Sequence, residues 1–154
     1  MIEKTSRKGI DRIILREQLC LTAYQCQAGV WTIGVGHTAG VKPGMKITRE
    51  RALELLQEDL EPIHLQLVET QIRGAVMTQE QFDALASFMM PIGITAYHTS
   101  TLRRYLINHA EPETIARQIR RWIWYTDRRT GEKKKSPGLI NRRESEAKQY
   151  MGLL

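Results

Sequence analysis

A short segment of β-type sequence between long helical segments is the feature that most constrains this chain. Residues 23 to 38, AYQCQAGVWTIGVGHT, combine β-branched residues and a tryptophan with three glycines, as in a short twisted hairpin. Glycine in such a segment indicates positive φ angles or a close approach of the backbone to another group. The other periodic segments have the apolar spacing of helices. The sequence therefore predicts a mostly helical α+β fold with one small antiparallel β-hairpin near the N-terminus.

The first helical segment covers residues 6 to about 19 and carries a carboxylate on its apolar face. Ile10, Ile13, Ile14, Glu17 and Leu21 follow the i, i+3, i+4, i+7 spacing of an amphipathic helix. This spacing places Glu17 on the apolar stripe, immediately ahead of the predicted hairpin.

Five further helices are predicted along the chain. Thr48 can cap the first of them, which Pro62 is expected to end or kink. Thr78 and Gln81 form a capping box at the start of the second, which residues 91 to 93 interrupt. The others span residues 101 to 108, a segment that begins with Pro112 at its first helical position, and residues from about 139 to the C-terminus. Between the last two, residues 126 to 138, TDRRTGEKKKSPG, predict a basic loop.

Length and composition favour one compact domain. A chain of 154 residues with 42% hydrophobic residues buries roughly two thirds of its unfolded surface on folding. No repeat or low-complexity tract occurs, and the N-terminal residues hold no apolar run of signal-peptide or membrane-span length. Cys20 and Cys26 are too few for a disulfide framework, and we expect both thiols to be reduced. No Cys/His cluster has the spacing of a zinc site, so no metal is expected.

The basic charge of the chain is concentrated in its C-terminal third. Residues 103 to 154 hold 13 Lys and Arg against 6 Asp and Glu, and the net charge of the whole chain is +6. Such a surface suits a polyanion, either a nucleic acid, an anionic membrane or a bacterial cell wall. No helix-turn-helix or other nucleic-acid-reading motif accompanies these residues, so we expect no nucleic-acid partner.

Glu17 is the first candidate for chemistry. Partial burial disfavours the charged form of a carboxyl group and raises its pKa, which is what a general acid for glycosidic cleavage needs. The alternative is a structural salt bridge from Glu17 to Arg16 or to a basic residue of the C-terminal third. The spacing of the residues leaves both interpretations open.

Several blocks of residues form a recognisable series along the chain. They are Arg16-Glu17, Ala23-Tyr24, Gly29, Trp31-Thr32-Ile33-Gly34, Gly36-His37-Thr38, Pro43-Gly44-Met45, Ile47-Thr48, Leu55-Leu56, Asp59-Leu60, Ser100-Thr101-Leu102, Gly138-Leu139 and Arg142-Arg143-Glu144 with Glu146. The series resembles the phage-type lysozymes, glycoside hydrolase family 24. The resemblance extends over nearly the whole chain.

The resemblance implies a two-lobed lysozyme-like fold in a single domain, residues 1 to 154. An N-terminal lobe at about 15 to 60 would hold the β element, a linking helix would span about 48 to 70, and a helical C-terminal lobe about 71 to 154. The implied function is that of an endolysin or muramidase, which hydrolyses the β-1,4 bond between N-acetylmuramic acid and N-acetylglucosamine in bacterial peptidoglycan without any cofactor. We expect a monomer with no transmembrane segment, held in the host cytoplasm until it is released to the periplasm and cell wall.

The resemblance also implies a catalytic set of Glu17, Cys26 and Thr32. In the family, a Glu protonates the leaving oxygen, while an Asp or Cys and a Thr place the attacking water on the opposite face, which is inverting hydrolysis. A thiol with an ordinary pKa of about 8.5 is mostly neutral near pH 7 and is a weak base. Three interpretations of Cys26 stay open: a thiolate favoured by a nearby cation or by the hairpin amides, a residue that mainly orders water, or a small apolar residue in a site that has lost activity.

Further residues are assigned by the same resemblance. The residues interpreted as structural and close to the site are Gly34, Gly36 and His37, and those interpreted as substrate-binding are Thr38, Met90 and Pro91. Gln18 stands where many members have glycine, and residues 90 to 93, MPIG, stand where many have Phe-Asn-Val-Gly. With Cys26, these departures keep a second hypothesis open: a weakly active or inactive cell-wall-binding or secretion-associated module.

Overall fold

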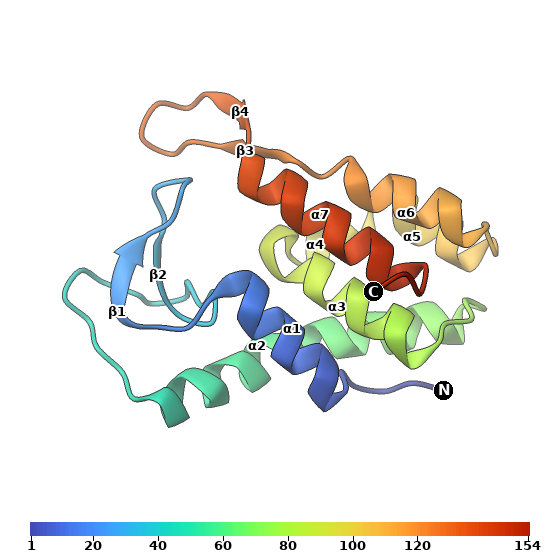
Figure 1. Ribbon diagram of the computed structural model, residues 1–154, viewed down its shortest axis with the longest axis horizontal. Helices are drawn as coiled ribbons and strands as arrows, with labels where there is room; N and C mark the ends of the chain where they lie inside the picture. The colour runs from blue at the N-terminus through green and yellow to red at the C-terminus, as the bar shows by residue number, and fades with distance from the viewer.

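The computed structural model describes all 154 residues, which form seven helices and two antiparallel two-stranded sheets (Figure 1). In chain order the elements are α1 (Arg7–Glu17), β1 (Cys20–Gln25), β2 (Trp31–Gly34), α2 (Arg49–Ile72), α3 (Gln79–Ile92), α4 (Ile94–His98), α5 (Thr101–Ile107), α6 (Pro112–Arg120), β3 (Trp124–Thr126), β4 (Lys133–Lys135) and α7 (Pro137–Tyr150). The predicted mostly helical α+β fold is confirmed.

Helix α1 begins and ends where local residues stop the helical hydrogen bonding. The Ser6 hydroxyl accepts a hydrogen bond from the Gly9 N–H at 3.1 Å and caps the helix. At the other end, Gln18 has φ 64° and ψ 155°, a conformation that is almost restricted to glycine. The helix therefore ends at Glu17, slightly before the predicted end. The placement of Leu21 on the helical stripe is wrong, because Leu21 lies in β1 with 40% of its surface exposed.

The predicted hairpin is present and begins three residues early, at Cys20. β1 pairs antiparallel with β2, with Tyr24 opposite Thr32 and Gln25 opposite Trp31. The register shifts between Cys20 and Tyr24, as at a β-bulge. The hairpin packs on one end of α2 and extends toward the β3–β4 hairpin (Figure 1).

Helix α2 spans the molecule from the β1–β2 hairpin to the far end of the helical part (Figure 1). The Thr48 hydroxyl accepts from the Arg51 N–H at 3.1 Å, so the predicted cap is confirmed. Pro62 lies inside the helix, which continues to Ile72. Pro62 therefore does not end α2, because packing of its apolar side against α3 supports the helix past the missing hydrogen bond.

The hydrophobic core is centred on α3, which packs against α1, α2 and α7. The predicted capping box is confirmed, because the Gln81 N–H donates to the Thr78 hydroxyl at 3.1 Å and the Gln81 side chain accepts from the Thr78 N–H at 3.0 Å. Eight consecutive residues of α3, 82 to 89, are buried. The helix ends at Ile92, where Gly93 takes φ 82°.

A second hairpin replaces the predicted basic loop. β3 and β4 pair antiparallel, with Trp124 opposite Lys135, and the Lys135 ammonium lies 5.3 Å from the centre of the Trp124 ring. Three consecutive lysines have low strand propensity, which is why the sequence predicts a loop. The pairing and the turn around Asp127 override that propensity.

Two further expectations concern membrane-spanning helices and the two cysteines. None of the helices is both long and apolar enough to span a membrane. Both Cys20 and Cys26 are free and partly exposed.

Candidate active site

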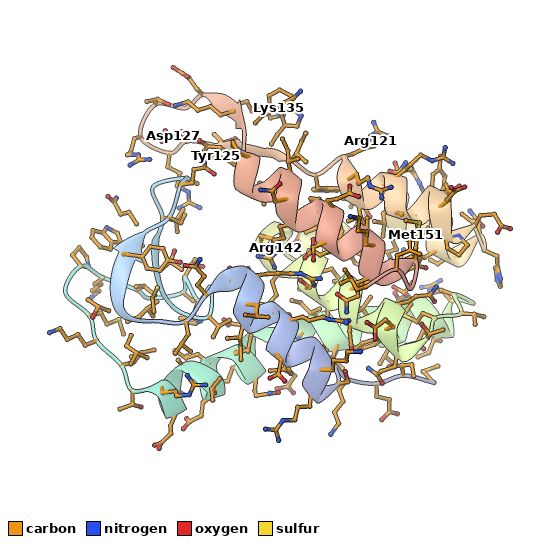
Figure 2. All side chains as sticks on the ribbon, in the orientation of Figure 1. Arg121, Tyr125, Asp127, Lys135, Arg142 and Met151 are labelled. Atoms are coloured by element: carbon orange, nitrogen blue, oxygen red, sulfur yellow. The ribbon has the colours of Figure 1, made fainter.

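Glu17 is the last residue of α1, and its carboxylate faces α7. Arg142 donates from Nη1 to Glu17 Oε1, and Figure 2 shows Arg142 lying between α7 and the C-terminal end of α1. Of the partners considered from the sequence, the structure selects this basic residue of the C-terminal third rather than Arg16. The Glu17 side chain is 16% exposed. Oε2 makes no hydrogen bond within the protein, so one carboxyl oxygen is available for a ligand.

Arg142 belongs to a buried cluster of polar side chains. It donates to Glu146 Oε2 at 3.1 Å and to the Ser87 carbonyl at 2.8 Å. Glu146 is completely buried and also accepts from Arg143 at 2.6 Å and from the Ser87 hydroxyl at 2.5 Å. Burial lowers the pKa of Arg142, but Glu146 and Glu17 outweigh burial and the pKa is raised. The charge beside Glu17 is therefore permanent, and its position is set by three acceptors.

Arg16 points away from its sequence neighbour Glu17. It donates to the Ser145 hydroxyl at 2.9 Å and to Gln149 Oε1 at 2.8 Å. Adjacent residues of a helix do not share a face, so Arg16 and Glu17 contact different parts of α7. Arg16 helps to fasten α1 to α7 without pairing with Glu17.

Gly36 brings the backbone after β2 against the Glu17 carboxylate. A methyl group at Gly36 would lie 2.6 Å from Glu17 Oε2, and the backbone has φ 69°. Both the close approach and the left-handed conformation require glycine. Gly36 thus forms the wall of the site on the hairpin side of Glu17.

His37 and Gly34 connect the same segment to α2. The His37 ring binds Asp59 Oδ2 through Nδ1 at 2.8 Å and the Ala39 carbonyl through Nε2 at 2.9 Å. Gly34 has φ 65°, and a methyl group there would lie 3.4 Å from the side chain of Ala52 on α2. These contacts hold residues 34 to 37 against α2, next to Glu17.

Cys26 follows β1 and begins the turn to β2. Its N–H donates to the Val30 carbonyl at 2.9 Å, and its carbonyl accepts from the Gly29 N–H at 2.8 Å. Gly29 has φ 83°, which closes the turn at a position where other residues are strained. The thiol is thus carried by a tight turn at the tip of the hairpin.

Thr32 and Tyr24 face each other across the hairpin. Thr32 is 4% exposed, and its hydroxyl donates to the Val30 carbonyl at 2.9 Å, so its oxygen retains acceptor capacity. Burial, with smaller contributions from Cys20, Glu17 and Cys26, raises the pKa of Tyr24. Tyr24 therefore lies in the electrostatic neighbourhood of both Glu17 and Cys26. The site prediction omits it, although the Ala23-Tyr24 pair is part of the family pattern.

The three predicted substrate contacts lie on two segments. Thr38 is exposed after β2, and Pro91 is exposed at the end of α3, where the neighbouring Met90 packs partly against the core. Their roles stay predictions. A pocket of about 440 Å³ elsewhere on the C-terminal part was not predicted; its lining residues are Thr101, Gln118, Arg121, Trp122, Trp124 and Lys133.

Comparison with known proteins decides the family. The model of the family described as phage lysozyme matches residues 16–146, from Arg16 through Glu146. The chain belongs to this family. An endolysin of Acyrthosiphon pisum secondary endosymbiont phage 1 is 40% identical to this phage lysozyme over 141 residues, which cover 92% of this chain and 93% of the relative.

Solved structures agree with the family over the full length. The endolysin from Escherichia coli O157:H7 phage FAHEc1 is 37% identical, with a TM-score of 0.84 over 100% of this chain and 96% of the other. The muramidase domain of SpmX from Asticaccaulis excentricus is 33% identical, with a TM-score of 0.82 over 97% and 99%. The two-lobed lysozyme-like fold is therefore confirmed. This phage lysozyme is a muramidase that hydrolyses the β-1,4 bond between N-acetylmuramic acid and N-acetylglucosamine in bacterial peptidoglycan.

Proposed function

We propose that Glu17 is the general acid of this lysozyme and that Cys26 and Thr32 position the attacking water, in an inverting reaction. The observation that carries the proposal is the Glu17 carboxyl group, which is held by Arg142 on one oxygen and has its other oxygen free beside Gly36. In the reaction, Glu17 delivers a proton to the leaving sugar oxygen while water attacks the opposite face of the sugar.

Helix α7 provides a common frame for both halves of this reaction. Arg142 on α7 binds Glu17, and the α7 cap Ser136 donates to Gln27 Oε1 at 2.6 Å, next to Cys26. Ser136 and Arg142 belong to the same helix, so α7 contacts both Glu17 and the turn that carries Cys26.

A thiol at position 26 suits the ordering of water better than its deprotonation. Water attack on an oxocarbenium-like centre needs little base strength once the leaving group is protonated. The Thr32 oxygen is an acceptor and the Cys26 thiol a weak donor and acceptor, so together they can orient one water molecule. Glu17 is therefore expected to supply most of the rate.

Several finer properties stay predictions. They are the lobe boundaries near residues 48 to 70, the contacts of Thr38, Met90 and Pro91 to the sugar chain, the monomeric state, the absence of a nucleic-acid partner, and a cytoplasmic stage before release to the wall.

The test follows the turbidity of outer-membrane-permeabilised Gram-negative cells and identifies the soluble fragments by mass spectrometry. We expect Glu17→Gln to lower the rate by about 10²–10⁴, the range of general acid–base catalysis. Glu144→Gln is the matched control, because Glu144 pairs with Arg120 at the surface of α7. Cys26→Ser should lower the rate less than Glu17→Gln does. Product with an inverted anomeric configuration is expected in nuclear magnetic resonance spectra taken at early times.

Two results would contradict the proposal. Full activity of Glu17→Gln would remove Glu17 from the acid role. Wall binding without soluble fragments from the unaltered protein across pH 5 to 8 would favour the alternative of an inactive cell-wall-binding or secretion-associated module.

A further inference from the structure

The tip of the β1–β2 hairpin is fastened to the β3–β4 hairpin. The Arg128 N–H donates to the Ala28 carbonyl at 3.0 Å, and Arg129 donates from Nη2 to the Gln27 carbonyl at 3.0 Å. The third contact is the Ser136 hydroxyl on Gln27. Figure 1 shows the two hairpins approaching each other at the same end of the molecule. We call this set of three hydrogen bonds the hairpin clasp.

The clasp accounts for every hydrogen bond that residues 26 to 30 make outside their own hairpin. Their other hydrogen bonds stay within it, including those that close the turn from Cys26 to Val30. The position of the turn relative to the C-terminal lobe is therefore set by the clasp. Because Gln27 directly follows Cys26, the clasp also sets the position of the thiol.

The Arg129 side chain packs over the Cys26 turn and is held in place by Asp127. Its side chain lies over Gly29, where a methyl group would come within 3.2 Å of Arg129 Nε. Asp127, which is 5% exposed, accepts from the Arg129 N–H at 2.9 Å and from its Nε at 3.2 Å. Lys134 lies 3.5 Å from the other Asp127 oxygen. Figure 2 shows Asp127 where the two hairpins meet.

We propose that Arg129, oriented by Asp127, is a positioning residue that holds the Cys26 turn opposite Glu17. The β3–β4 hairpin thus contributes to catalysis from a segment that makes no contact with Glu17 itself. The effect on rate rests on the proposed role of Cys26, whereas the effect on the position of the thiol does not. A displacement of about 1 Å in a catalytic group can cost 10²-fold in rate, so a loosened clasp should lower kcat.

The test compares Arg129→Ala with Arg128→Ala, both in a Cys20→Ser background that leaves Cys26 as the single thiol. Both changes remove one positive charge from the same turn. Arg128 contributes only its backbone N–H to the clasp, and alanine retains that group. The readouts are the alkylation rate of Cys26 by iodoacetamide, which is uncharged, and kcat and KM on soluble peptidoglycan fragments.

We expect Arg129→Ala to raise the alkylation rate about threefold or more and to lower kcat about tenfold, with KM changed less than about twofold. Arg128→Ala should leave all three near the parent values. Asp127→Asn, which keeps Arg129 but weakens its support, should change them in the same direction as Arg129→Ala. Circular dichroism and thermal unfolding confirm that each variant is folded.

The outcomes separate this proposal from the catalytic one. Equal alkylation rates in Arg129→Ala and Arg128→Ala would overturn the positioning role, whatever the activities. Faster alkylation of Arg129→Ala with unchanged kcat would retain the clasp and overturn the catalytic role of Cys26. Loss of kcat without a change in alkylation would overturn the clasp as the cause.

Discussion

The two sides of the proposed site are held by contacts of different kinds. On the acid side, Glu17 binds Arg142, whose other partners lie in a buried cluster around Glu146. On the water side, the Cys26 turn is held by three hydrogen bonds, one of which comes from Arg129, whose side chain is 55% exposed. Removing one partner of a buried charge pair is costly, whereas an exposed pair contributes little. Substitutions on the acid side should therefore lower the free energy of unfolding more than substitutions on the water side do.

The test with the largest expected effect removes the positive charge that pairs with Glu17. We expect Arg142→Met to lower the free energy of unfolding by about 3–5 kcal/mol, because Glu146 would stay buried with one fewer partner. Arg120→Met is the matched control, because Arg120 pairs with Glu144 at 2.8 Å with 35% and 44% exposure and should cost less than about 1 kcal/mol. Denaturant unfolding measures both. Equal losses would mean that burial does not distinguish the acid side.

The second test introduces a methyl group against the Glu17 carboxyl group. In Gly36→Ala the new methyl group would meet Glu17 Oε2, and the displaced acid should lower kcat about 100-fold. Gly40→Ala is the control, because Gly40 has φ 71° but nothing within 4 Å. Both variants bear the left-handed backbone cost of about 1–2 kcal/mol. Steady-state kinetics with unfolding curves separates the two effects, and similar kcat values in both would contradict a close fit around Glu17.

The third test concerns Gln18, the residue that connects the acid side to the water side. Gln18 connects Glu17 to the hairpin with φ 64° and ψ 155°, so Gln18→Gly should raise the free energy of unfolding by about 1 kcal/mol. In contrast, Gln57→Gly, at an exposed position of α2, should lower it by about 0.5–1 kcal/mol. Thermal unfolding of the pair measures the difference. A loss of stability in Gln18→Gly would show that the glutamine side chain matters more than the backbone strain.

The smallest effect is expected at His64 of α2, which contacts Thr5 just before the start of α1, and it depends on pH. His64 Nε2 accepts from the Thr5 N–H at 3.2 Å, and burial lowers the pKa of His64 below its ordinary value of 6.5. The unfolded chain then binds the proton more tightly, so stability is full above about pH 6.5 and declines as pH falls below it.

This decline should be seen as a lower Tm between pH 7 and pH 5, and it should be weaker in His64→Gln. His98→Gln is the control, because His98 is exposed and bonds only the Gln66 side chain. The same slope in His64→Gln and the parent would assign the pH dependence to other groups.

Elements that depend on nearby residues were predictable. The caps at Thr48 and Thr78 and the helical start at Pro112 involve residues within one turn of the helix, so the sequence predicts them closely. The β1–β2 hairpin is marked by its own glycines and β-branched residues. An error occurs where distant groups decide: the lysines of β4 form a strand because β3 pairs with them.

For the site, the sequence by itself determined which residues are candidates for the chemistry. The order of Glu17, Cys26 and Thr32 in the family pattern predicts their roles without coordinates. Only the tertiary structure decided what holds them, since Arg142 and Arg129 lie more than a hundred residues away from Glu17 and Gln27. Many basic residues of the C-terminal third could have served, and no local pattern distinguishes them. The choice follows from packing of α7 against α3, which brings one guanidinium to Glu17 and leaves the others in solvent or in other pairs.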